Sequence, residues 1–309
     1  MEIINGFEYY PARYLGGALA IGKFDGLHRG HVRILEQLGD YAKKYSIPSV
    51  VFTFDPPPKN ILRPDLAPPF LTILEQKMEL MEQSNVDLVI VQPTTQEFLN
   101  WSAKYFFDEV ICKTIQAKVV IEGKNFGFGR NREGTPELLE SFCREKNIIF
   151  EVISSIRSSG YEISSSRIRS LLMDGYVETA REMLVRPYRL TGTVIHGEHR
   201  GQTLGFPTAN LGNVQTLIPK NGIYAAVSTV REKQYATAVH IGDNPTFGET
   251  PSKIEAFLID FSGDIYGETL HVDFFARLRD ITAFPSKDAL IEQMNRDVQQ
   301  VLEMVNLQE

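Results

Sequence analysis

Short apolar runs alternate with amphipathic stretches over the first half of the chain, and this alternation constrains the fold more than any other feature. Residues 18–22 (ALAIG) predict a buried strand, and a glycine-rich turn then leads into residues 30–38, whose apolar side chains recur at helical spacing. Because strands that alternate with helices form parallel sheets covered on both faces, we expect a Rossmann-like α/β domain here. Further strands are expected at residues 49–54, 86–92, 119–122 and 148–153, and further helices at 71–83, 103–114, 136–145 and 166–174.

From Tyr188 onward the pattern changes to short, often alternating segments that are separated by Gly, Asn, Asp or Pro. They predict an antiparallel barrel or sandwich. Residues 286–307 carry one apolar stripe and predict a terminal helix that covers this structure. The strands are expected at residues 190–195, 223–229, 234–241, 254–261 and 270–276, and the stripe consists of Leu290, Met294, Val298, Val301, Leu302 and Val305.

Length and composition indicate the number of domains, the classes of partner and the cellular location. The 309 residues are about twice the roughly 150 of a usual domain, so two domains are expected, with the boundary at Arg186–Pro187, where a residue before proline disfavours helix. The formal net charge of −7 offers no general attraction to nucleic acid or to an anionic membrane. Two cysteines without CxxC spacing fit a reducing cytoplasm, and we expect neither secretion nor a membrane span.

The segment 22–31 (GKFDGLHRGH) lies where a predicted parallel strand ends and a helix begins, a position that favours phosphate binding. His28 and His31 are three residues apart, so both imidazoles can face one anion. A surface histidine pair or an incomplete metal site is the alternative. Three glycines within the segment favour nucleotide binding. They are Gly22, Gly26 and Gly30.

This segment resembles the HxGH signature of nucleotidylyltransferases, in the form carried by bacterial bifunctional riboflavin kinase/FAD synthetases. The resemblance implies an FMN adenylyltransferase domain at residues 1–186 and a riboflavin kinase β-barrel with a terminal helix at 187–309. The chain would convert riboflavin and ATP to FMN, and FMN and ATP to FAD and pyrophosphate, with Mg²⁺. It would bind no nucleic acid and no membrane, and its oligomeric state stays open. The other matching motifs are Thr72 with Lys77, residues 122–129 (EGKNFGFG), 163–169 (ISSSRIR), 186–188 (RPY), 201–211 (GQTLGFPTANL), 222–224 (GIY), 240–247 (HIGDNPTF) and 266–267 (YG).

The resemblance also assigns roles in the first site. His28, His31 and Arg169 would stabilise charge during transfer of AMP, where catalysis is mainly positioning and no covalent nucleophile is needed. Ordinary helix capping is the alternative for the serines of ISSSRIR. The nucleotide contacts implied in this half are Gly22, Phe24, Asp25, Gly26, Gly30, Asn125, Ser165 and Ser166.

Two positions depart from the family pattern. Pro57 stands where the family's FxPHP box has histidine, and Asn125 stands where its DFxFG box has aspartate. Both changes remove an ionisable group. They support an alternative in which this domain is a weak or inactive adenylyltransferase that serves as a nucleotide- or flavin-binding module beside a working kinase.

In the second half, the GFPTAN segment presents Thr208 and Asn210, whose side-chain oxygens suit Mg²⁺ bound to nucleotide phosphates. A capped turn on a barrel rim is the alternative. The chain has no GxxxxGK[ST] sequence, so a kinase must hold ATP by another route. The resemblance implies that Gly197, Gly201, Gly205 and Pro207 supply that route.

Glu255 lies in an apolar strand segment, KIEAFLIDF, where a carboxylate needs a reason to be present. A general base that accepts the proton of a hydroxyl attacking the γ-phosphate is one reason, and the family places its catalytic glutamate here. A carboxylate on the exposed face of an edge strand is the alternative. Arg279 and Phe284 match positions that line the flavin site, although a loop arginine is usually only solvated.

Overall fold

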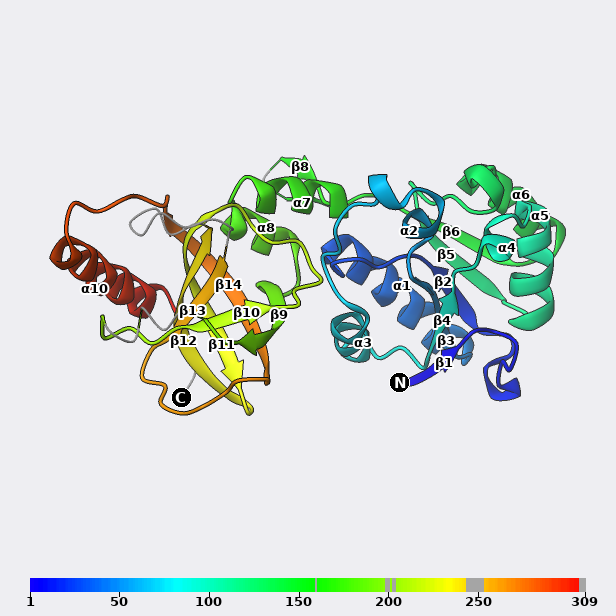
Figure 1. The fold of residues 1–309 in the computed structure, drawn as a ribbon. Coiled ribbons are helices and arrows are strands. Elements are labelled where there is room, and N and C mark those ends of the chain that lie inside the picture. The colour runs from blue at the N-terminus through cyan, green and yellow to red at the C-terminus, as the bar shows by residue number, and fades with distance from the viewer. Residues whose placement is uncertain (159, 198–200, 202–203, 243–252, 306–309) are drawn as a thin grey trace. The chain divides into compact units, whose positions relative to one another are not determined.

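The computed structural model describes residues 1–158, 160–197, 201, 204–242 and 253–305. The chain forms two compact units, Met1–Pro68 with Thr72–Ser164 and Pro69–Leu71 with Ser165–Glu309 (Figure 1). By this division the helices after residue 164 group with the second unit. The boundary at Arg186–Pro187 stays a prediction about the functional domains.

The first unit contains a six-stranded parallel sheet in the order β1-β4-β3-β2-β5-β6. This confirms the Rossmann-like prediction. The edge strand β1 was not predicted, because an edge position leaves Ile3 50% exposed and the strand therefore lacks a continuous buried run. The strands are β1 (Glu2–Asn5), β2 (Ala18–Ile21), β3 (Ser49–Asp55), β4 (Leu88–Pro93), β5 (Val119–Gly123) and β6 (Ile149–Ile153), and a small hairpin follows with β7 (Arg157–Ser158) and β8 (Tyr161–Glu162).

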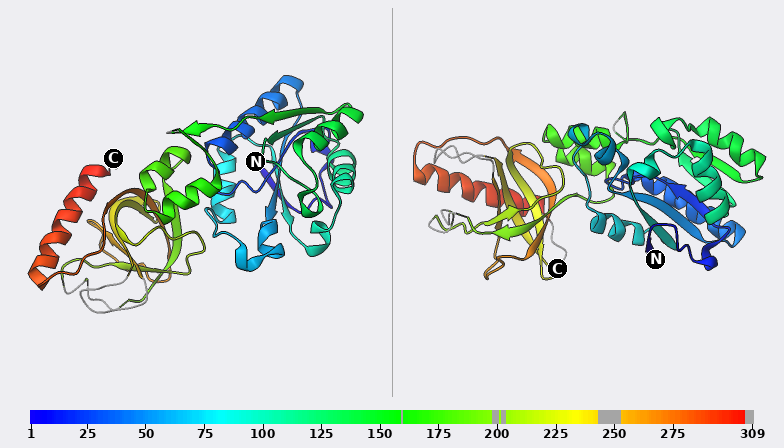
Figure 2. Two further views of the ribbon diagram at one scale, coloured as in Figure 1. Left: turned by 90° about the horizontal axis from the view of Figure 1, so that it is seen from above. Right: turned by 45° about the vertical axis from the view of Figure 1, so that its right-hand side comes forward.

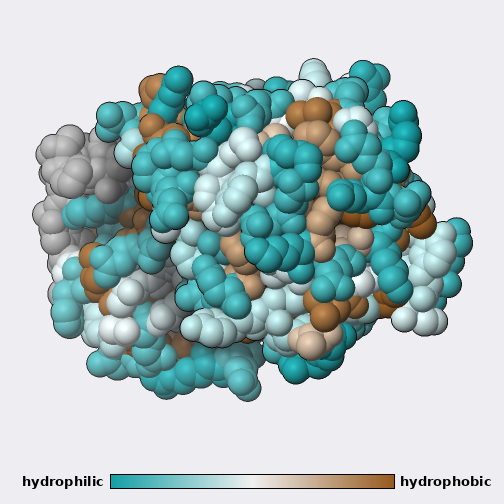
Figure 3. All heavy atoms as spheres, turned by 90° about the vertical axis from the view of Figure 1, so that its right-hand side faces the viewer, coloured by the Kyte–Doolittle hydropathy of each residue, from teal (hydrophilic) through white to brown (hydrophobic). Residues whose placement is uncertain are grey.

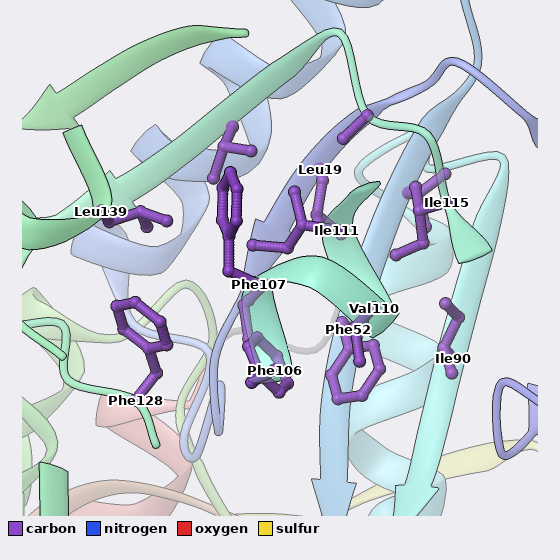
Figure 4. Close-up of a cluster of buried hydrophobic side chains, with 14 of the residues drawn as sticks. Leu19, Phe52, Ile90, Phe106, Phe107, Val110, Ile111, Ile115, Phe128 and Leu139 are labelled. Atoms are coloured by element: carbon purple, nitrogen blue, oxygen red, sulfur yellow. The ribbon is translucent and has the colours of Figure 1, made fainter. Parts of the chain in front are cut away.

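Helices cover both faces of this sheet. They are α1 (Arg29–Tyr45), α2 (Pro58–Leu62), α3 (Leu74–Glu82), α4 (Gln96–Leu99), α5 (Ala103–Phe106) and α6 (Pro136–Glu145). On one face Leu19, Phe52 and Ile90 pack against residues 103–115 and α6, as Figure 4 shows. The next residues along the same strands point to the other face, as strand alternation requires, and pack against α1 and α3. Those residues are Ala20, Val51 and Val89.

The helix predicted over residues 103–114 is α-helical only in its first turn. Phe107–Thr114 winds as a π-helix, and at its end the Ile115 amide donates to the Val110 carbonyl five residues earlier. Apolar periodicity does not distinguish this wider winding from an α-helix. The helix predicted at 71–83 begins only at Leu74, because Thr72 is bonded to the loop after β2.

The second unit contains a closed six-stranded barrel in the order β10-β13-β12-β11-β14-β9, and all neighbouring strands are antiparallel. The left view of Figure 2 looks into it. Because the sheet closes on itself, the structure is the barrel and not the sandwich of the two predicted alternatives. The strand β10 was not predicted, because only four residues of the GFPTAN region pair. The strands are β9 (Tyr188–Ile195), β10 (Ala209–Gly212), β11 (Gly222–Val230), β12 (Lys233–Gly242), β13 (Lys253–Leu258) and β14 (Thr269–Arg279).

Within its described residues, this unit has the helices α7 (Ser165–Met173), α8 (Val177–Met183) and the terminal α10 (Lys287–Met304). Ser286 caps α10, since its hydroxyl accepts from the Ala289 amide. Val301 and Val305 are buried against barrel residues, which confirms that the helix covers the barrel. Leu302 is 44% exposed, so its place in the predicted apolar stripe was wrong. It lies about 100° around the helix from Val301 and falls outside the buried stripe.

Hydrophilic residues dominate the face shown in Figure 3, where hydrophobic ones gather only in small separate areas. Among the helices that the structure describes, none is both long enough and apolar enough to span a bilayer.

Candidate functional sites

The chain order places the first site at a switch point of the sheet. After β2 the chain builds β3 and β4 on one side, and β5 then lies on the other side of β2. Ligands bind such sheets outside the carboxyl ends of the two strands that flank this point. The segment 22–31 leaves β2 here, and the segment 122–129 closes β5 beside it.

His28 is the N-cap of α1. Its Nδ1 accepts a hydrogen bond from the backbone amide of His31 at 3.3 Å, so the neutral ring carries its proton on Nε2. Burial lowers the pKa of His28 to about 4. Gly30 leaves room for this ring, because a Cβ there would lie 3.1 Å from the ring atoms of His28. At pH 7 His28 is therefore an uncharged hydrogen-bond donor at a helix N-terminus.

His31 stacks on His28, with ring centroids 3.7 Å apart and an interplanar angle of 11°. Burial lowers the pKa of His31 well below its usual value, and repulsion from Lys77, from Lys23 and from His28 in its protonated form lowers it further. The edge of Phe24 contacts the His31 ring at a centroid distance of 5.3 Å. The two histidines thus form a stacked pair of neutral rings.

Thr72 holds the loop between β2 and α1 through two hydrogen bonds. The Gly26 amide donates to Thr72 Oγ1 at 3.1 Å, and the Thr72 amide donates to Asp25 Oδ1 at 3.1 Å. Gly26 adopts a φ of +82°, which glycine tolerates without strain. Phe24 is 2% exposed, so only its backbone can reach a ligand. Asp25, Gly26 and Phe24 therefore shape this loop, and the Gly26 amide is already bonded.

Two further ionisable groups are buried near this loop. Lys77 is 4% exposed, and burial lowers its pKa while Asp25 and Asp55 act in the opposite direction. Glu122 is the penultimate residue of β5, and its Oε1 accepts from the Ile21 amide at 2.8 Å. Burial raises the pKa of Glu122 well above its usual range, while the hydrogen bond from Ile21 acts in the opposite direction.

The two positions that depart from the family pattern have different surroundings. Asn125 is exposed, and its Nδ2 donates to Glu162 Oε1 at 3.5 Å. Lys124 also binds Glu162, at 3.0 Å, and this contact is the main reason that the pKa of Glu162 is lowered. Pro57 precedes α2 with φ −60° and ψ 145°, a conformation that histidine also adopts.

The serines and arginines of ISSSRIR lie in the first turns of α7. Arg169 Nε donates to the Pro69 carbonyl at 2.7 Å. Ser165, Ser166 and Arg169 belong to the second compact unit, whereas the histidines belong to the first. A joint role for these residues stays a prediction.

The second site lies on the outer face of the barrel. In β13 the side chains of Ile254, Ala256 and Leu258 are buried, while the intervening Glu255 is partly exposed. Residues directly opposite each other on antiparallel strands share a face, with Cβ atoms about 5 Å apart. Residues that are paired in the strand register therefore form a row of side chains across neighbouring strands of the barrel. This row is Ile195, Asn210, Glu255, His240, Ile223 and Arg279.

Glycines allow the GFPTAN segment to lie close to its neighbours. A Cβ on Gly197 would lie 2.6 Å from Asn210 Cγ, and a Cβ on Gly201 would lie 3.4 Å from Thr208 Oγ1. Gly205 adopts a φ of +89°. The side chains gathered here offer the hydroxyl of Thr208, the amide of Asn210 and the neighbouring carboxylate of Glu255 in the row. Hard oxygen donors of this kind fit Mg²⁺.

Within the described part of the chain, no group of three or more His, Cys, Asp or Glu side chains could hold a metal ion. Thr208 and Asn210, with Glu255 beside them, would leave most positions around a Mg²⁺ ion to waters and to oxygens of the ligand. Such shared coordination is common for this ion, because Mg²⁺ usually keeps waters and binds substrate phosphates.

Arg279 ends β14 and is not merely solvated. Its guanidinium binds the carboxylate of Asp297 in α10, with Nη2 to Oδ2 at 2.7 Å and Nε to Oδ1 at 3.0 Å. Asp297 is 4% exposed and also accepts from Gln293 Nε2 at 2.8 Å. The ring of Phe284 lies 5.6 Å from the guanidinium carbon. Arg279 thus joins one end of the row to the terminal helix.

Comparison with known proteins finds one family in the first half of the chain and another in the second half. The model of the FAD synthetase family matches residues 12–167, and the model of the riboflavin kinase family matches residues 184–305. A bifunctional riboflavin kinase/FMN adenylyltransferase of Haemophilus influenzae is 32% identical over 300 residues, which are 97% of each chain. The chain belongs to this family. Other members are similar over nearly their whole length: the Escherichia coli K12 protein (32% identity, 96% of each chain) and that of Buchnera aphidicola from Schizaphis graminum (30% identity, 99% of this chain and 100% of the relative).

A solved structure from Streptococcus pneumoniae also matches this family member, with a TM-score of 0.88 and 29% sequence identity. It covers 99% of this chain and 100% of the other. It is named a macrolide-efflux protein.

Sequence reasoning did not assign a role to His240, although this residue opens the HIGDNPTF motif of the family. His240 lies directly opposite Glu255, and its Nδ1 is 3.5 Å from Glu255 Oε2. A histidine within the small and apolar run of residues 236–242 (ATAVHIG) was the available signal, but only the strand register shows its partner. Residues 243–247 of the motif, and residues 202 and 203 of GQTLGFPTANL, lie outside the described residues.

Proposed function

We propose that the chain carries two consecutive activities. Its riboflavin kinase part transfers the γ-phosphoryl group of ATP to riboflavin and yields FMN and ADP. Its FMN adenylyltransferase part transfers AMP from a second ATP to FMN and yields FAD and pyrophosphate. The matches to both family models support both activities, and one structural observation carries the kinase reaction: Asn210 and Glu255 stand side by side on the outer face of the barrel.

In the kinase reaction, Glu255 accepts the proton of the riboflavin primary hydroxyl as its oxygen attacks the γ-phosphorus, a contribution of typically ~10²–10⁴-fold. Thr208 and Asn210 would hold Mg²⁺, and the ion when bound would supply charge neutralisation at the phosphates. In this proposal ATP lies on the Asn210 side of Glu255, and the flavin lies on the side of Arg279 and Phe284. The register supports this order, because it puts Asn210 and Arg279 on opposite sides of Glu255 in the row.

In the adenylyltransferase reaction, the neutral ring of His28 donates a hydrogen bond from Nε2 to a phosphate oxygen. The stacked ring of His31 helps to stabilise the charge on the phosphates. The first amides of α1 add further donors and a favourable dipole for an anion. Ser165, Ser166 and Arg169 supply hydroxyl and guanidinium donors to the triphosphate. No covalent intermediate is needed, because FMN phosphate attacks the α-phosphorus of ATP directly and pyrophosphate leaves.

The free cysteines support a reducing location, which we propose is the cytoplasm. Cys143 is fully buried, and burial raises the pKa of its thiol to about 12. Both cysteines pack in the core of the first unit, where a thiol with a high pKa is unreactive.

A second candidate function applies to the first unit alone. The lost histidine at Pro57 and the lost carboxylate at Asn125 favour a weak adenylyltransferase that mainly binds nucleotide or flavin beside a working kinase. The two candidates differ in the rate at which FAD forms.

The test uses the purified full chain with ATP and Mg²⁺. One reaction starts from riboflavin and the other from FMN, and chromatography separates riboflavin, FMN and FAD. We expect FMN in the first reaction and FAD in the second. No FMN from riboflavin would contradict the kinase, whereas FMN without any FAD would favour the binding module.

A further inference from the structure

The barrel carries a histidine, His240, that none of the proposed steps uses, and it lies beside the proposed base Glu255. His240 on β12 and Glu255 on β13 are directly opposite in the antiparallel register. His240 Nδ1 lies 3.5 Å from Glu255 Oε2, and the two side chains are only 16% and 22% exposed. Nδ1 is buried and has no hydrogen-bond partner among the described residues, and the 3.5 Å approach to Glu255 is longer than a formed hydrogen bond. A buried ring nitrogen without another partner points to Glu255 as its acceptor.

The contact with His240 bears on the orientation of the Glu255 carboxylate, which a general base needs. Glu255 has Asn210 on one side, from β10, and His240 on the other side, from β12. The oxygen that faces His240 is Oε2, so Oε1 is the oxygen left to receive a proton. The carboxylate of a glutamate rotates about three side-chain torsions unless a neighbour holds it, and loss of orientation slows proton transfer.

We propose that His240 is a positioning residue of the kinase: its Nδ1–H donates a hydrogen bond to Oε2 of Glu255 and keeps Oε1 directed to the hydroxyl of riboflavin. This inference rests on the proposed role of Glu255 as the base. His240 itself contacts neither substrate and gains or loses no proton in the reaction.

Two variants with the same number of side-chain heavy atoms test the proposal. In His240→Asn, the side-chain amide offers an N–H donor close to the position of Nδ1, whereas in His240→Leu no donor remains. We expect His240→Leu to lower the kcat of FMN formation about 10-fold, the lower end of what outer hydrogen-bond partners contribute at functional sites. His240→Asn should recover most of this loss. The KM values for ATP and riboflavin should stay within about twofold in both variants, because the contacts that bind the substrates are unchanged.

Far-UV circular dichroism and thermal unfolding of the same preparations show whether the barrel of each variant is folded, and FAD formation from supplied FMN is the control for the first unit. Equal kcat losses in His240→Asn and His240→Leu would overturn the proposal, since shape and not the donor would then matter. A rise in KM without a change in kcat would also overturn it, because His240 would then act in substrate binding.

A double-variant cycle separates this inference from the assignment of the base. Once Glu255→Gln has removed the base, adding His240→Leu should change kcat by less than about twofold, because the two residues act as a unit. A further 10-fold loss would mean that His240 acts independently and would overturn the inference. If Glu255→Gln alone kept the wild-type rate, the proposed base would fail. If Glu255→Gln abolished FMN formation while His240→Leu had no effect, only the role of His240 would fail.

Discussion

The two units build their sites in different ways. In the first unit the chemistry lies in loops at the carboxyl ends of parallel strands, and its ionisable groups are buried. Burial lowers the pKa values of His28, His31 and Lys77 and raises that of Glu122. In the second unit the chemistry lies in the middle of strands, and the register alone brings Asn210, His240 and Glu255 together.

This difference shows what each site depends on. The loop site is specified within ten consecutive residues, and its histidines are set by a helix cap and a stack. The barrel site depends on three strands that are 30 and 15 residues apart in the chain, at positions 210, 240 and 255. Slipping any of these strands by one residue would turn its side chain to the other face.

Removing the proposed base should have the largest effect and should be confined to the barrel. Glu255→Gln keeps the volume of the side chain but cannot accept a proton, so we expect FMN formation to fall by about 10²-fold or more. FAD formation from supplied FMN should stay unchanged. Chromatography of both reactions measures this. A folded variant that makes FMN within a few-fold of the wild-type rate would remove Glu255 from the role of base.

The buried His28 should make the stability of the first unit depend on pH. Its pKa is about 4 in the folded chain and near 6.5 when unfolded, so below pH 6.5 the unfolded chain binds the extra proton and stability is lost as pH falls towards 4. Between pH 7 and pH 5 we expect the wild type to lose about 2 kcal/mol more than His28→Asn, which keeps a good helix cap but cannot titrate.

Urea unfolding followed by the fluorescence of Trp101 measures this difference, because the chain has one tryptophan and it packs in the first unit. Parallel pH dependences in the wild type and in His28→Asn would show that the neutral state of His28 does not contribute to stability.

Restoring the lost histidine tests whether the loop site is impaired. If Pro57 removed a phosphate donor, the loss is on the order of 10²–10³-fold, so we expect slow FAD synthesis that Pro57→His accelerates by at least about 10-fold. Asn125→Asp should add nothing by itself, because the new carboxylate would face Glu162, which now accepts from Asn125 at 3.5 Å. Rates of FAD formation in the single and double variants measure both effects.

Wild-type FAD synthesis as fast as FMN synthesis would show that neither departure matters. A complete absence of FAD that Pro57→His does not change would instead favour the binding module.

The smallest expected effect is on the metal requirement of the barrel. Thr208→Ala removes one oxygen donor, and we expect it to raise the Mg²⁺ concentration needed for half-maximal FMN formation several-fold, with a parallel rise for ATP. Asn210→Ala should act in the same direction. The Mg²⁺ dependence of FAD formation is the control. Equal changes in both reactions would mean that the GFPTAN segment does not serve the kinase alone.

Most of the fold could be predicted from the sequence, because strand and helix patterns are local. The predicted strand at 49–54 and the helix at 136–145 were confirmed within one residue, since apolar runs and a Thr-Pro helix start are specified by neighbours in the chain. The short β1 and β10 were not predicted, because each is defined by pairing with distant strands. The change to a π-helix at 107–114 also has no local signal.

For the sites, the sequence by itself determined the motif that follows β2, because a strand end, a glycine turn and a capped helix follow one another along the chain. Only the tertiary structure decided that His28 and His31 are neutral, since burial comes from segments far away in the sequence. Only the barrel register decided that His240 lies opposite Glu255 and that Arg279 binds Asp297. The physical reason is that side-chain periodicity shows which residues share a face of one strand, whereas the alignment of neighbouring strands depends on packing of the whole barrel.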